Sequence, residues 1–95
     1  MKEILLDGAA WQSAEDFYTA FLPTVGAPDW HGHNLDALWD SLGAGGINQV
    51  NPPLRVMIRG GARMGTDAKN FVARFQKLVE DLRKDGIDVE LHLES

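Results

Sequence analysis

The chain has 95 residues, of which 44% are hydrophobic and 24% charged, with a formal net charge of −5 and no cysteine. These values are typical of one globular domain and exclude disulfides, iron–sulfur clusters, cysteine-based zinc sites and thiol nucleophiles. No apolar run reaches the roughly 20 residues of a membrane span, and the start is too short and too acidic for a signal peptide, so we expect a cytoplasmic protein that does not bind membranes.

The first half of the chain predicts one strand followed by two helices. Residues 2–7 form a short apolar run that suits a strand. Residues 13–16 resemble a capping box, and the apolar residues after them recur at helical spacing until Gly26, so we expect a first helix there. Asn34 is a favourable N-cap for a second, short helix, whose apolar stripe should be buried: Leu35, Leu38, Trp39 and Leu42.

The second half predicts a strand, a long helix and a last strand. A loop rich in glycine and proline over residues 43–53 separates it from the second helix. Residues 54–60 and 87–93 alternate between apolar and polar side chains, as half-buried strands do. Between them, Thr66 is the expected N-cap of the longest helix, which holds the helical period to Leu82. This order implies right-handed crossovers, and therefore a single α/β domain with about three to four helices on a three-stranded parallel sheet.

Two aspartates, Asp36 and Asp40, lie four residues apart on the predicted second helix, and no Lys or Arg occurs between Glu3 and Leu54. Like charges at this spacing cost roughly a few tenths of a kcal/mol, and Asp40 near the helix C-terminus also opposes the macrodipole. Residues 1–54 carry seven acids and a single base, Lys2, whereas the remaining residues carry seven acids and eight bases. This negative half repels nucleic acid and attracts a basic partner.

The two aspartates and the neighbouring motifs have other interpretations besides a contact surface that binds a basic protein. A solvated acidic helix face is the plainest, and a general acid–base pair would need a nucleophile or metal that the segment does not supply. The turn over residues 60–66 lacks the lysine of a P-loop, and Asp67 occupies the anion-favouring end of the following helix. We expect that the protein is not an enzyme and binds neither a cofactor nor a metal ion. The alternative is a metal site on His31 and His33, which elemental analysis would exclude if the purified protein contained no metal.

The segment formed by Gly32, residues 34–40 and Leu42 resembles the barstar family, small intracellular inhibitors of the secreted ribonuclease barnase. It combines a turn glycine, an N-cap, the apolar stripe and both acids, and a weaker similarity follows the same order along essentially the whole chain. The resemblance implies a three-stranded parallel sheet with helices packed on it. It also implies that the partner is a basic, extracellular-type ribonuclease and that the protein catalyses nothing.

The resemblance further implies which residues would bind the ribonuclease. The second helix and the loop before it would block the active site, with Asp36 and Asp40 in the places of RNA phosphates and Trp30 where the family has a tyrosine. An acidic contact from the last helix falls on Asp81. Trp39, on the apolar stripe, is expected mainly in the core. The complete set of expected partner-binding residues is Trp30, His31, Gly32, His33, Asn34, Leu35, Asp36, Trp39, Asp40 and Asp81.

The chain also departs from the family in several places. His33 replaces a family acid, and Ser41 and Ile87 occupy positions where barstar has cysteines. The loop after Leu42 is longer and lacks aromatic and acidic contacts, and residues 60–66 are too few for the extra helix that precedes the last one in barstar. A second candidate keeps the same surface but a different partner: an immunity protein that neutralises a different basic toxin. The free protein is expected to be monomeric.

Overall fold

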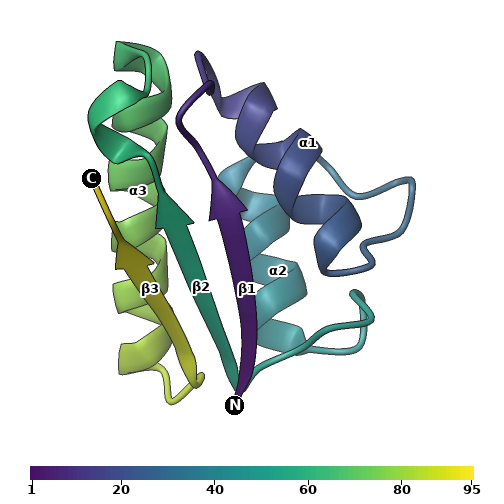
Figure 1. Ribbon diagram of the computed structural model, residues 1–95. Coiled ribbons are helices and arrows are strands. Elements are labelled where there is room, and N and C mark those ends of the chain that lie inside the picture. The colour runs from purple at the N-terminus through teal and green to yellow at the C-terminus, as the bar shows by residue number, and fades with distance from the viewer.

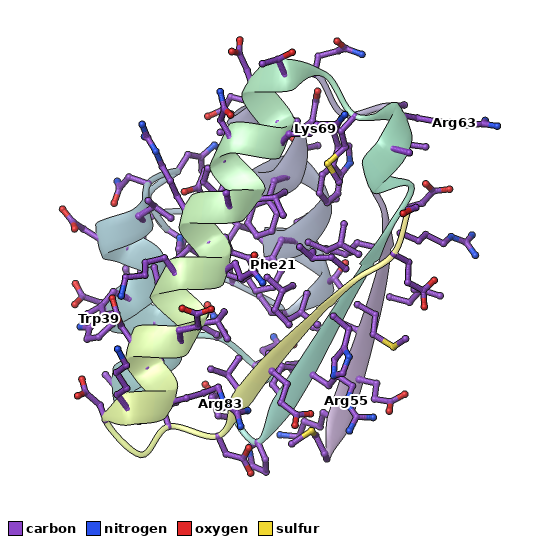
Figure 2. The ribbon with its side chains drawn as sticks, turned by 90° about the vertical axis from the view of Figure 1, so that its left-hand side faces the viewer. Phe21, Trp39, Arg55, Arg63, Lys69 and Arg83 are labelled. Carbon is purple, nitrogen blue, oxygen red and sulfur yellow. The ribbon has the colours of Figure 1, made fainter.

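The fold, seen in a computed structural model that describes residues 1–95, places three α-helices on one side of a three-stranded sheet (Figures 1 and 2). A short 3-10 helix, η1 (Gly61–Arg63), precedes the last α-helix. The predicted α/β fold with its parallel sheet is confirmed. Among the helices, none combines the length and apolarity that crossing a bilayer requires. The principal elements are β1 (Lys2–Asp7), α1 (Ala14–Thr24), α2 (Leu35–Ala44), β2 (Leu54–Arg59), α3 (Thr66–Lys84) and β3 (Val89–Leu93).

The sheet has the strand order β1-β2-β3, and both neighbouring pairs are parallel. Ile4 lies opposite Val56, and Val56 lies opposite Leu91. Every second side chain points toward the helices, because successive side chains of a strand alternate between the two faces of a sheet. The alternating sequence therefore buries one face, whose most buried side chains are Ile4, Leu6, Leu54, Val56, Ile58 and Val89.

The outer face of the sheet has no helix over it, as Figure 2 shows around Arg55. Arg55 donates hydrogen bonds to Glu3 at 2.7 Å and to Glu90 at 3.0 Å, so one cation links all three strands. The hydrogen bond from Arg55 lowers the pKa of the Glu90 carboxyl, and the same contacts raise the pKa of Arg55. Leu5 on this face is 58% exposed. The face is therefore solvated, with most of its charges paired internally.

The core lies between the sheet and the helices and is centred on Phe17 of α1, which is fully buried. The ring of Phe17 lies within 6 Å of five other aromatic rings, with centroid separations from 4.9 to 5.8 Å. These rings belong to Trp11, Tyr18, Phe21, Phe71 and Phe75. Helix α3 contributes two of them because its apolar residues recur with the helical period. The core thus fixes α1 against α3.

The ends of the elements differ slightly from the prediction. Gly65, not Thr66, is the N-cap of α3, and β3 begins at Val89 rather than at residue 87. At the start of α1, the Asp16 carboxylate accepts hydrogen bonds from the backbone amides of residues 12 and 13. Gly60 directly follows β2 and has a φ of +81°, and a Cβ at this position would lie 2.7 Å from the backbone nitrogen of residue 9. Chain geometry therefore requires a glycine at position 60, where this turn begins.

Candidate functional site

Helix α2 presents two carboxylates to solvent because its opposite side is fixed in the core. The Asn34 side chain accepts a hydrogen bond from the Ala37 amide at 2.8 Å and so begins the helix where predicted. Leu38 and Leu42 are buried. Asp36 and Asp40 are both exposed, and neither forms an ion pair.

Most other acids of the first half of the chain are engaged within the protein. Glu3 and Asp7 pair with arginines of β2, at 2.7 and 3.8 Å. Asp16 caps α1, and Glu15 bonds to His33. The acids of this half without an ion pair or hydrogen bond are therefore those of the predicted site and its loop, namely Asp29, Asp36 and Asp40.

Trp39 corrects the prediction that this indole belongs to the core. Its side chain is 37% exposed and lies at the outer edge of the molecule beside α3 (Figure 2). Trp39 follows Leu38, and one helical step of about 100° carries the indole to the border of the buried stripe. Leu35, at the other end of the stripe, is half-buried. The narrow buried face thus leaves an aromatic surface next to the two acids.

A groove runs between α2 and α3 beside these acids. We call this hollow of about 350 Å³ the α2–α3 groove; its lining residues are Leu35, Asp36, Trp39, Arg74, Lys77, Leu78 and Asp81. Asp81, the predicted acid of the last helix, does lie here, but the Lys77 ammonium donates a hydrogen bond to it at 2.9 Å. That bond and the charge of Asp81 raise the pKa of Lys77. The tertiary structure therefore places cations beside the half of the sequence that lacks them.

The loop before α2 holds one histidine inside and one tryptophan outside. His31 is only 5% exposed, and its imidazole lies 2.8 Å from the Gly32 carbonyl oxygen and 3.0 Å from the buried Ser41 hydroxyl. The imidazole therefore points into the protein, where it connects the loop to Ser41 of α2. Trp30 is 74% exposed. The buried histidine thus fixes the base of a loop whose tryptophan is free to contact a partner.

His33 is held by two residues of α1 that the sequence pattern did not single out. Its Nδ1 lies 2.8 Å from a carboxylate oxygen of Glu15. Its ring stacks on Tyr18, with centroids 5.2 Å apart and planes inclined by 17°. Because both nitrogens of His31 face other groups, the two histidines do not converge on a shared ligand. The contact with Glu15 thus places a carboxylate beside the imidazole of His33.

Tyr18 is the single tyrosine of the chain and is 2% exposed. Burial and, to a smaller extent, the charge of Glu15 raise its pKa from 10.0 to about 12. Between these values the unfolded chain ionises first, so the free energy of unfolding should fall by up to about 1.4 kcal/mol per pH unit. Below about pH 10 Tyr18 is protonated in both the folded and the unfolded chain, so this group causes no change in the free energy of unfolding there.

Replacing Tyr18 by phenylalanine should therefore remove this alkaline loss. The expected result is a smaller drop in the free energy of unfolding for Tyr18→Phe than for the unmodified protein between about pH 10 and about pH 12. Urea denaturation across this range measures it, and an ultraviolet titration of the single tyrosine checks the pKa. Parallel pH profiles for the two proteins would contradict the assignment.

Comparison with known proteins adds relatives to this geometry. A family model described as Barstar (barnase inhibitor) matches residues 1–94. The Bacillus subtilis (strain 168) protein named "Putative ribonuclease inhibitor YrdF" is 27% identical over 89 residues, which cover 90% of this chain and 93% of that protein. The match includes the sheet, the three helices and the acids of α2 in one continuous stretch. The chain therefore belongs to the barstar family.

Proposed function

We propose that this protein inhibits a basic ribonuclease by placing α2 and the loop before it in the phosphate-binding cleft of the enzyme. The observation that carries the proposal is the pair of exposed, unpaired carboxylates of Asp36 and Asp40 on a helix whose other face is buried. Membership of the barstar family and the name of the Bacillus subtilis relative support it. In this role the protein is a binding partner and performs no catalysis.

The chemistry of the proposed contact is charge-assisted hydrogen bonding. A cleft that binds RNA phosphates offers Arg, Lys or protonated His side chains, and carboxylates accept hydrogen bonds from all three. A rigid helix limits the conformational entropy lost on binding. Because Leu38 and Leu42 fix α2 in the core, the two acids are already held in place before the enzyme arrives.

The other proposed contacts surround the two acids. Trp30 provides the largest exposed apolar surface of the loop, and Trp39 provides a half-exposed indole on α2. His33 is exposed, and its imidazole is already bonded to the Glu15 carboxylate, so a partner would meet the two side chains together. The remaining members of the proposed set have mainly structural tasks here: His31 and Gly32 shape the loop, Asn34 caps α2, Leu35 packs partly on the core and Asp81 bonds to Lys77.

A direct assay tests the proposal. Barnase and a set of other basic bacterial ribonucleases would be mixed with the protein, and RNA cleavage would be measured as the inhibitor concentration rises. We expect stoichiometric loss of cleavage for at least one enzyme, weakened by salt because charged groups make the contact. Undiminished cleavage by every enzyme at inhibitor excess would refute the proposal.

A second candidate is an immunity protein that neutralises a different basic toxin, acting in the cytoplasm as a monomer until the toxin arrives. The altered surroundings of the two acids favour it, because His33 and the long loop after α2 differ from the family pattern. Affinity capture from the native host discriminates the two. Recovery of a secreted ribonuclease supports the first proposal, and recovery of a toxin nuclease with a delivery domain supports the second.

A further inference from the structure

The α2–α3 groove continues past Leu35 into a second hollow. This hollow of about 280 Å³ reaches toward α1 and includes Tyr18 and His33 in its lining. Three residues line both hollows: Leu35 and Asp36 from α2, and Arg74 from α3. The ridge between the hollows thus carries an acid from one helix and a cation from the other.

Neither charge of this ridge is neutralised within the protein. Asp36 and Arg74 line the same two hollows, yet no nitrogen–oxygen pair between them lies within 4.0 Å. Lys77, the other cation of the groove, is bound to Asp81 at 2.9 Å. Arg74 is therefore the cation of the groove that remains available to an external group.

We propose that Arg74 is a specificity-determining contact that receives an Asp or Glu side chain of the ribonuclease while Asp36 and Asp40 receive its cations. This inference rests on the proposed inhibitor function and adds to it. A planar guanidinium donates two parallel hydrogen bonds to a carboxylate, a geometry that a lysine cannot reproduce. The binding face is consequently bipolar rather than uniformly acidic.

The arrangement of charges identifies a folded protein surface as the occupant. A polynucleotide carries only negative phosphates, and Asp36 beside Arg74 repels a phosphate chain laid along the ridge. A protein surface can place a cation and a carboxylate a few ångströms apart. An enzyme with a basic side chain opposite Arg74 would meet like-charge repulsion, which excludes that enzyme even if its cleft suits the aspartates.

The test uses a ribonuclease that the unmodified protein inhibits, with barnase as the first probe. Arg74→Gln should raise the dissociation constant by about tenfold, because a charge-assisted contact is lost. Lys69→Gln is the matched control: it removes the same charge from the same exposed helix but lines a separate hollow beside β3, and it should change the constant by less than about twofold. Thermal unfolding should show that both variants fold.

A charge exchange then identifies the opposing group. Arg74→Glu should abolish tight binding, and replacing the facing carboxylate of the enzyme by lysine should restore it. Unchanged or tighter binding of Arg74→Gln, with Asp40→Ala still disruptive, would overturn the inference alone, because Arg74 would then only mask Asp36. Failure of the unmodified protein to inhibit any ribonuclease would instead overturn the proposed function together with the inference.

Discussion

Replacing Asp40 by alanine is expected to weaken inhibition of the target ribonuclease by about 100-fold, which corresponds to a loss of about 3 kcal/mol for a charge-assisted contact. Asp40 is exposed on α2 and has no partner in the free protein, so its removal leaves an enzyme cation without its acceptor. The measurement is the dissociation constant from a competition assay at low salt. Because the contact is ionic, the difference between the two proteins should shrink as salt is raised.

The free Asp40→Ala protein should be slightly more stable than the unmodified protein, with a higher free energy of unfolding. The substitution removes a like-charge neighbour of Asp36 at i, i+4 and a negative charge in the second half of α2, each worth roughly a few tenths of a kcal/mol. Glu94→Ala serves as control, since this exposed acid follows β3, lines a hollow that contains no residue of α2, and should leave inhibition unchanged. Equal inhibition by the Asp40 variant and the unmodified protein would remove Asp40 from the site.

Replacing Phe17 by alanine should lower the free energy of unfolding by about 3–5 kcal/mol. The ring is fully buried at the centre of the aromatic cluster, and its removal leaves a cavity that five surrounding rings cannot close by small movements. A domain of this size has a total stability of about 5–15 kcal/mol, so the loss is a large fraction of it. Urea denaturation at constant temperature measures the change.

Leu5→Ala is the matched control for the core substitution. Leu5 is hydrophobic and lies on a strand, but it is 58% exposed on the outer face of the sheet. Its truncation should change the free energy of unfolding by less than about 0.5 kcal/mol. Similar losses for both variants would show that the outer face is covered in solution and would contradict the assignment of the core to the helix side alone.

The secondary structure was predictable because the signals for it are local. Residues 2–7 form a short apolar run and residues 54–59 alternate between apolar and polar side chains, and in both strands every second side chain is buried. The apolar period of α3 extends over 19 residues, so one face of the helix had to be buried. The errors fall at the ends, where one cap residue such as Gly65 competes with its neighbour Thr66.

The candidate site was predictable only in part, since periodicity assigns a residue to a stripe but not to its border. It placed Asp36 and Asp40 on the outside of α2, but it also assigned Trp39 to the core, where the structure leaves the indole 37% exposed. How far a stripe is covered depends on the helix that packs beside it. For α2 that helix is α3, and its position is fixed by the aromatic core around Phe17.

Charge shows the same division between local and tertiary information. The order of residues makes the first half acidic and predicts that α2 carries two free carboxylates, because the cap, the apolar stripe and the acids all lie within one short segment. Which acids are neutralised depends on contacts between distant residues: His33 meets Glu15 18 positions away, and Arg55 meets Glu3 52 positions away. Arg74 reaches the acidic helix only because α3 packs beside α2. Long-range packing thus turned an acidic segment into a bipolar surface.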